Sequence, residues 1–284
     1  MTTEPAHAPA RPARGVLGPL RALIGPRHPV VAVVPMQGAI MAGGRVGRAF
    51  DDAQLAPMLE RAFRVRGVSA VALAINCPGG SAVQSSMIGA RIRRLSAERK
   101  LPVFAFCADV AASGGYWLAC AADEIYADPA SIVGSIGVIA ASFGFPEAIA
   151  RLGVERRVHT SGEQKSFWDP FQPEREEDVE RLLGLQDAIH KQFADWVISR
   201  RGDRLADGRN LFNGEFWDGE KARQLGLIDG IGHLVPVMKT RFGEKTKFRV
   251  FARKRPLFSR FGLAGADTLA DELQARALYA RFGL

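Results

Sequence analysis

Hydrophobic and polar positions follow two alternating patterns along the chain. Continuous β-branched and apolar runs, typical of strands buried on both faces, occupy residues 29–40, 68–76 and 102–109. Segments with helical spacing of apolar residues follow them at 51–65, 81–100 and 144–153, and a longer one spans about 173–201. The alternation predicts an α/β protein with mainly parallel sheets. Its strand–strand–helix rhythm favours coiled ββα units over a doubly wound Rossmann sheet.

Shorter patterns complete the expected order of elements. We expect strands at 124–128, 131–140, 154–160 and 247–252. We also expect a short helix at 113–122, two helices joined by a short turn at 216–243 and an amphipathic helix at 268–282. The sequence is therefore divided into a flexible Pro/Ala/Arg-rich arm at 1–28, a folded domain at 29–250 and a C-terminal extension at 251–284. We expect residues 1–28 to be mostly unstructured, with a peripheral membrane contact as the alternative.

Composition narrows the class of protein. Hydrophobic residues make up 47% and charged residues 24% of the 284 residues, as in ordinary globular proteins. The net charge of +8 is scattered, and no basic run is interleaved with aromatic residues, so nucleic acid is not an expected partner. The three cysteines form no C-x-x-C pair, and no His/Asp/Glu cluster has metal spacing. No glycine-rich nucleotide motif is present, and no apolar run is long enough to span a bilayer. We therefore expect neither metal nor cofactor.

Two glycine-rich corners carry candidate chemistry. Ser113 precedes a glycine pair at the start of an apolar helix, where it is either an N-cap or a nucleophile on a tight turn. Gly80 lies in "NCPGGSA" (76–82), whose glycines can expose backbone N–H groups for an oxyanion, or can simply serve a strand-to-helix turn. Gly114 can supply a second N–H group beside the serine. Taken alone, each corner favours the structural interpretation.

Two further segments supply possible partners for Ser113. Ser135 lies within the apolar "SIVGSIGV", where a buried hydroxyl needs a hydrogen-bond partner. Lys165 is followed by Phe167, Trp168 and Phe171, and an amine enclosed by aromatic rings loses water, which favours its neutral, basic form. A solvated lysine is the ordinary alternative. His159 is the one histidine close to a candidate segment, so a Ser–His pair is the less favoured arrangement.

Four segments in order resemble the bacterial signal peptide peptidase A family, also called protease IV-type peptidases. They are "INCPGGSA", "DVAASGGYWLACAADEIYADPASIVGSIGV", "HTSGEQKSFWDPF" and "GEFWDGEKARQLGLIDGIG". The resemblance covers roughly residues 30–240, and it implies a Clp/crotonase-like fold and a Ser–Lys dyad. It implies that Ser113 is the nucleophile, Lys165 the general base, Ser135 the holder of the lysine amine, and Gly80 and Gly114 the oxyanion donors.

The resemblance also implies a function and partners. Members cut peptides, notably signal-peptide remnants, and assemble into homo-oligomeric rings in which neighbours help to complete each site. We therefore expect a serine endopeptidase acting on peptides or unfolded proteins, located in the cytoplasm or peripherally at the inner membrane. The chain departs from the family in showing no N-terminal transmembrane anchor, and in carrying Cys77 where serine is frequent.

Two other functions stay open at this point. A crotonase-like acyl-CoA enzyme would also use paired glycine N–H groups as an oxyanion hole, but it would need neither Ser113 nor Lys165. A non-catalytic scaffold would need no dyad at all. If Lys165 is the base, the reaction rate rises towards alkaline pH, because the amine must lose its proton.

Overall fold

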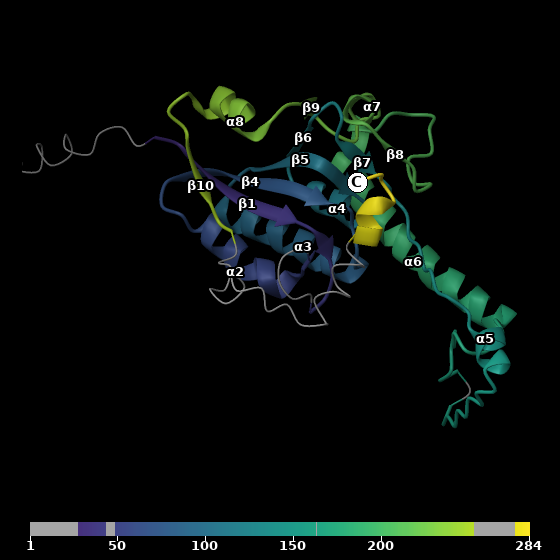
Figure 1. The fold of residues 1–284 in the computed structure, drawn as a ribbon. Coiled ribbons are helices and arrows are strands. Elements are labelled where there is room, and N and C mark those ends of the chain that lie inside the picture. The colour runs from purple at the N-terminus through teal and green to yellow at the C-terminus, as the bar shows by residue number, and fades with distance from the viewer. Residues whose placement is uncertain (1–27, 44–48, 163, 253–275) are drawn as a thin grey trace, which may run out of the picture.

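A single eight-stranded sheet forms the centre of the computed structural model, which describes residues 28–43, 49–162, 164–252 and 276–284. The strand order is β10-β1-β4-β5-β6-β9, and β7 pairs with β5 while β8 pairs with β7. The strands are β1 (Val30–Gln37), β4 (Val68–Cys77), β5 (Val103–Ala112), β6 (Glu124–Ala127), β7 (Ile132–Gly134), β8 (Phe216–Trp217), β9 (Gly230–Ile231) and β10 (Lys247–Val250). Only the β7–β8 pair of this sheet is antiparallel, which confirms the predicted mainly parallel α/β architecture (Figure 1).

Helices cover both faces of the sheet. The larger core lies under α2 (Asp52–Phe63), α3 (Ala82–Arg99) and α4 (Gly114–Ala119), whose apolar residues pack on β1, β4 and β5. On the opposite face, Met238 of α8 (Leu234–Phe242) packs on Val31, Val33 and Phe104 (Figure 1). The central strands are therefore buried on both sides, which explains why their sequences are continuous apolar runs. The remaining strands, β2 (Ala39–Ile40) and β3 (Ala49–Phe50), form a small separate pair, and α7 (Gly219–Gln224) follows β8.

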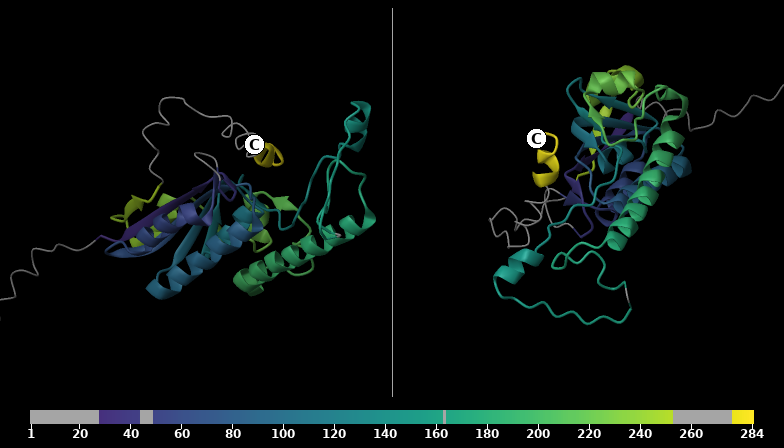
Figure 2. Two further views of the ribbon diagram at one scale, coloured as in Figure 1. Left: turned by 90° about the horizontal axis from the view of Figure 1, so that it is seen from below. Right: turned by 90° about the vertical axis from the view of Figure 1, so that its right-hand side faces the viewer.

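A long extension leaves this body between β7 and β8. It comprises residues 138–190, which we call the arm from here on and which is distinct from the N-terminal arm predicted at 1–28. It contains α5 (Pro146–Arg151) and the first part of α6 (Glu176–Arg201). Figure 2 shows the arm reaching away from the sheet, while the last turns of α6 pack on the body. Its 26 residues make α6 about 39 Å long. Among the described residues of the arm, Asp178 alone is buried.

One predicted strand is wrong. Residues 154–160 carry two valines among polar side chains, but they run along the arm as irregular, exposed chain. A strand requires a neighbour for its backbone groups, and this stretch lies away from the sheet. The expected strand at 131–140 is correspondingly shorter, since β7 ends at Gly134, where the chain turns towards the arm.

The C-terminal segment packs close to the end of β5. Residues 276–280 are helical, whereas the earlier part of the predicted helix, 268–275, lies outside the described residues. Phe282 packs with Val110 and Ala112, and its ring meets that of Phe216 edge to face. The hydroxyl of Tyr279 donates a hydrogen bond to the carbonyl of Asn76 at 2.9 Å. The extension therefore folds back onto the sheet.

Candidate active site

Ser113 occupies a strained corner between β5 and α4. Its backbone has φ 53° and ψ −123°, a region that L-residues rarely adopt, and α4 begins at the next residue. The side chain makes no capping hydrogen bond to the helix that follows, so the N-cap interpretation is not realised. The residue is only partly buried. A strained turn therefore holds a partly buried hydroxyl that has no hydrogen-bond partner among the described residues.

Two backbone N–H groups lie beside this corner. Gly80 has φ +139°, and its nitrogen is 3.4 Å from the point where a β-carbon on Gly114 would lie. Neither Gly80 nor Gly114 donates its N–H group to another residue in the described part of the chain. The neighbouring amides of Ile40 and Ser81 are by contrast used, in bonds to Gly79 and Ile40. The two unused donors form a candidate oxyanion hole next to Ser113.

Close packing fixes the two glycine corners against each other. A β-carbon on Gly115 would lie 2.2 Å from the carbonyl oxygen of Cys77, and one on Gly114 would lie 2.5 Å from the hydroxyl oxygen of Ser85. Only glycine permits this approach of α4 to the end of β4 and to α3, the elements on either side of the amide loop. The glycines therefore set the distance between the serine corner and the amide loop, in addition to supplying donors.

The thiol of Cys77 lies under this loop. It is fully buried, and burial raises its pKa to about 12, although a long contact with the carbonyl of Gly79 opposes the shift. A thiol with this pKa stays protonated at physiological pH and is a poor nucleophile. Cys77 is therefore part of the packing rather than of the chemistry.

Ser135 follows β7 at the position next to the Ser113 corner. Because Ala112 pairs with Gly134 in the β5–β7 register, Ser113 and Ser135 are the next residues of two neighbouring strands. The amide of Ser113 donates to the carbonyl of Gly134 at 2.8 Å, and the amide of Ser135 donates to Glu215 at 2.7 Å. Ser135 also has a positive φ, 54°, and is 8% exposed. The structure thus brings the segments of Ser113, Ser135, Gly80 and Gly114 together.

Lys165 is not part of this group within one chain. It lies on the arm in a turn at 164–168, its side chain is exposed, and no hydrogen bond joins it to Ser113 or Ser135 among the described residues. The aromatic residues that follow it leave it open to water in the single chain. His159 is likewise exposed on the arm. With the arm in this position, the Lys165 of the same chain does not form a dyad with Ser113.

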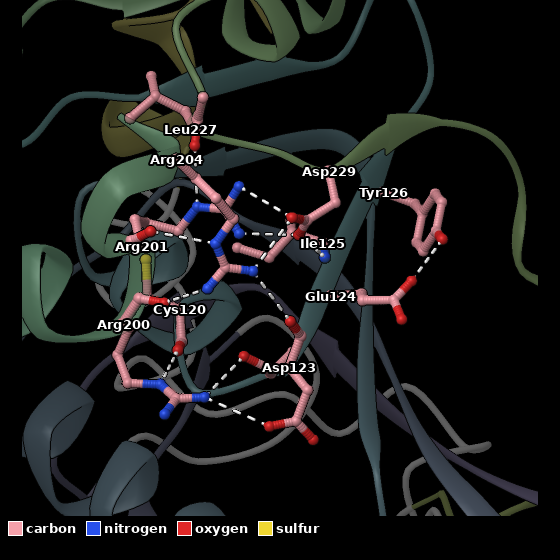
Figure 3. Close-up of polar contacts among 12 residues, drawn as sticks. Cys120, Asp123, Glu124, Ile125, Tyr126, Arg200, Arg201, Arg204, Leu227 and Asp229 are labelled. Atoms are coloured by element: carbon pink, nitrogen blue, oxygen red, sulfur yellow. Dashed lines mark hydrogen bonds and ion pairs between the residues drawn. The ribbon is translucent and has the colours of Figure 1, made fainter. Parts of the chain in front are cut away.

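The base of α6 is fixed to α4, the helix that follows Ser113. Phe193 stacks on Trp117 of α4 with ring centroids 4.7 Å apart, and the indole N–H of Trp196 donates to the carbonyl of Trp117 at 3.0 Å. The last turn of α6 then carries Arg200 and Arg201, which lie in a polar cluster (Figure 3).

Charge pairs, of which the one between Arg201 and Asp229 is the most buried, hold this last turn in place. Arg201, 3% exposed, forms hydrogen bonds of 2.8 and 3.2 Å to the carboxylate of Asp229, which Arg204 also contacts (Figure 3). Arg200 donates to the carbonyl of Cys120 at 2.9 Å and contacts Asp123. Burial by itself raises the pKa of Asp229, but hydrogen bonds and charge from Arg201 hold it below its ordinary value. The arm therefore leaves a rigid base.

Several of these residues are not identified by the sequence patterns. Gly79 approaches Ser113 more closely than Gly80 does, yet both read alike in "CPGG". The pairs of Arg201 with Asp229 and of Arg91 with Asp52 join residues far apart in the chain. The one available signal is the acidic first turn of α6, which contains Asp178 but does not distinguish it from Glu176 and Glu177.

Comparison with known proteins places the chain in a family. The sequence model of Peptidase family S49 matches residues 96–245. The Na(+)/H(+) antiporter NhaA of Brucella melitensis biotype 1 is 47% identical over 271 residues, which cover 89% of this chain and 37% of that protein. Protease 4 of Haemophilus influenzae is 32% identical over 71% of this chain and 32% of its own length. The chain thus spans 37% and 32% of the lengths of these relatives, and the ion transport in the name of the Brucella protein is a property of that protein.

A solved structure agrees with the fold. The 1510-N membrane-bound stomatin-specific protease, as a mutant in complex with a substrate peptide, superimposes with a TM-score of 0.51 at 14% identity, covering 86% of this chain and 99% of that one. This likeness supports the Clp/crotonase-like fold. No helix in the described ranges has the length and apolar character needed to cross a membrane. Because the family model covers more than half of the 284 residues, the chain belongs to Peptidase family S49.

Proposed function

We propose that the protein is a serine endopeptidase that cuts peptides or unfolded polypeptides through an acyl-enzyme. The observation that carries this proposal is the Ser113 corner, where a strained and uncapped serine stands beside the unused amides of Gly80 and Gly114. Such an arrangement suits acyl transfer, because the hydroxyl can attack a carbonyl carbon while two N–H groups receive the developing oxyanion.

In the proposed reaction Lys165 acts as general base and Ser135 holds its amine. The Ser113 oxygen bonds to the carbonyl carbon while its proton passes to the neutral amine of Lys165. The amine then gives this proton to the leaving nitrogen as the C–N bond breaks. Water then attacks the ester carbon and gives one proton to the same amine. The amine passes this proton to the Ser113 oxygen as the ester C–O bond breaks, which releases the carboxylic acid product.

We further propose that a neighbouring copy supplies Lys165. In the single chain Lys165 is exposed and its arm carries large exposed apolar side chains, including Ile139 (64%), Phe143 (80%) and Leu152 (77%). Isolated proteins rarely leave such a surface to water, and a second copy would cover it while bringing the amine to the site. A homo-oligomeric ring built from head-to-tail contacts satisfies both needs. A cytoplasmic location and a membrane contact through residues 1–28 stay predictions.

A serine-directed fluorophosphonate probe tests the nucleophile. We expect mass spectrometry to find the probe on Ser113, and we expect Ser113→Ala and Lys165→Ala each to abolish cleavage of casein. Lys191→Ala is the matched control, because Lys191 is an exposed lysine whose ion pair with Asp195 lies on the same helix. Labelling of another residue, or full activity of either variant, refutes the proposal and leaves the acyl-CoA enzyme and the scaffold as alternatives.

Mixing the two inactive variants tests the neighbouring copy. If Ser113 and Lys165 meet across an interface, unfolding and co-refolding Ser113→Ala with Lys165→Ala restores up to about a quarter of the activity, since about one interface in four then joins two intact partners. If each site uses its own chain, the mixture stays inactive. Lys165→Ala mixed with a Ser113→Ala/Lys165→Ala double variant is the control, because no intact lysine is then present.

A further inference from the structure

The turn that carries Lys165 is built around a strained backbone. Residues 164–168 form consecutive turns, and Trp168 at their end has φ 49°, in the left-handed region that disfavours bulky side chains. Four non-glycine residues of the described chain have positive φ, namely Lys100, Ser113, Ser135 and Trp168. Of these, Lys100 ends a helix, and the others lie in the three segments assigned to the reaction. Strain of this kind persists only where surrounding contacts enforce it.

The contact that enforces it comes from Asp178. The backbone N–H of Trp168 donates to the Asp178 carboxylate at 3.2 Å. Arg175 holds the same carboxylate with two hydrogen bonds of 2.9 and 2.8 Å. Asp178 is 4% exposed, and it is the one buried residue among the described residues of the arm. A carboxylate is costly to bury unless it is paired, so its place here reflects the bonds it makes.

A second carboxylate fixes the other side of the turn. Asp169 accepts the backbone N–H of Phe171 at 3.0 Å and two bonds from Arg156 at 3.0 and 2.7 Å. The Phe171 N–H group, followed by Arg156, lowers the pKa of Asp169, so this clamp is charged at neutral pH. Asp169 and Asp178 also line one cavity of about 160 Å³ together with Ser166.

Resting on the proposed function, we propose that Asp178 is a positioning residue for Lys165. It fixes the Trp168 peptide, and through it the direction in which the Lys165 side chain leaves the turn three residues earlier. It touches neither substrate nor Ser113. Its role is to present the amine in one orientation, so that no reordering of an exposed turn is needed when the base meets the serine.

The alternative is that Asp178 only stabilises the start of α6. Acidic residues in a first helical turn favour the helix, and Glu176 and Glu177 share that position. Glu177 provides the matched control, because it is exposed and has no hydrogen bond or ion pair with another described residue. Glu177→Gln removes the same charge from the same turn without touching Trp168.

The test measures the rate at which the fluorophosphonate probe labels Ser113, together with kcat and KM for a peptide. We expect Asp178→Asn to slow labelling by roughly tenfold and Asp178→Ala by about 100-fold, the loss a misplaced catalytic group typically causes. The change is expected in kcat, with KM within about twofold, while Glu177→Gln labels at the wild-type rate. Circular dichroism checks that α6 is still formed in each variant.

A double-mutant cycle separates positioning from general damage. In the Lys165→Ala background, Asp178→Asn is expected to slow the residual labelling no further, because the group it positions is gone. An equal loss in both backgrounds, or a wild-type rate for Asp178→Asn and Asp178→Ala, overturns the proposal. If the wild type itself is not labelled at Ser113, the proposed function has failed and the inference with it.

A milder variant covers the case in which Asp178 cannot be replaced without unfolding. Arg175 is 44% exposed and donates to both oxygens of the Asp178 carboxylate, one of which also accepts the Trp168 N–H group. Arg175→Gln leaves the bond from Trp168 to Asp178 in place but loosens it. We expect a threefold to tenfold slower labelling, again absent in the Lys165→Ala background, and an unchanged rate counts against the clamp.

Discussion

The α-carbon of Gly79 faces Ser113 so closely that a β-carbon on Gly79 would lie 2.8 Å from the β-carbon of the serine. The other nearest atoms are backbone, the carbonyl oxygen of Ala112 and the nitrogen of Gly114, both at 3.1 Å. None of these can move without moving the corner itself. The spacing between the amide loop and the serine therefore depends on the absence of a side chain at one position.

Gly79→Ala is expected to lower kcat/KM by about 100-fold, because it displaces Ser113 from the amides of Gly80 and Gly114. Gly67→Ala is the matched control. Gly67 also has a positive φ, +77°, but nothing lies within 4 Å of an added β-carbon, so only backbone strain of about 1 kcal/mol is added. Steady-state kinetics and thermal unfolding of both variants provide the measurement, and equal activity losses contradict the steric argument.

The Cys77 thiol is expected to resist alkylation and oxidation in the folded protein. Burial raises its pKa to about 12, so raising the pH from 7 to 9 produces almost no thiolate. Iodoacetamide followed by mass spectrometry is expected to leave Cys77 unmodified in the native protein and modified after denaturation. Inactivation by iodoacetamide at pH 8, with label on Cys77, contradicts the assignment.

The charge pair between Arg201 and Asp229 is expected to make stability depend on pH. Since the pKa of Asp229 is held below its ordinary value, its stabilisation is fully present above about pH 4, the ordinary pKa of aspartate, and is lost as the pH falls through the folded-state value. Asp229→Asn is expected to destabilise the protein by about 3 kcal/mol at pH 7, and by less at pH 3.

Thermal unfolding of wild type and Asp229→Asn between pH 3 and 7 measures this difference. Glu220→Gln is the control, because its ion pair with Arg223 has both side chains 50% exposed and is worth less than about 1 kcal/mol. A destabilisation by Asp229→Asn that stays constant over the whole pH range means that packing, rather than charge, holds the base of α6.

Phe143→Ser is expected to weaken the assembly of copies without weakening the single chain. Phe143 is 80% exposed, so its loss removes little from the folded monomer, whereas at a contact between copies a buried aromatic ring contributes several kcal/mol. Light scattering after size exclusion is expected to show a lower mass for the variant, with casein cleavage falling in parallel. An unchanged mass and activity place the contact elsewhere.

The sequence predicted the sheet well and the arm poorly. Runs such as Val103–Ala112 are apolar because they are buried from both sides, and that requirement is visible in every residue. In residues 154–160 the β-branched Val154 and Val158 suggest a strand, yet no strand of the described chain lies beside them. The local sequence pattern indicates the intrinsic secondary-structure preference of a segment. Whether a strand pairs depends on which other segments the fold places beside it.

The candidate site divides in the same way. Glycine-rich corners after apolar strands can be recognised from the sequence, because glycine is needed wherever two backbones approach closely. The structure brings Ser113, Gly80 and Gly114 of these corners close together. The environment of Lys165 could not be predicted from the sequence. The aromatic residues after it suggest an amine shielded from water, whereas Lys165 is exposed in the single chain. The role of Asp178 depends on a bond to the Trp168 backbone, and backbone bonds leave no residue-type signal.

A single uninterrupted helix joins the Trp117 contact at one end of α6 to the Asp178 clamp at the other. The number of residues in such a helix sets both the distance between its two ends and the rotation of one end relative to the other. Inserting one residue between Asp178 and Phe193 shifts the distal end by about 1.5 Å and also swings it by about 100° around the axis. Only insertions or deletions of about seven residues, two full turns, would change the length of α6 and keep the angular position of its distal end. Length variants of α6 should therefore be tolerated in steps rather than continuously.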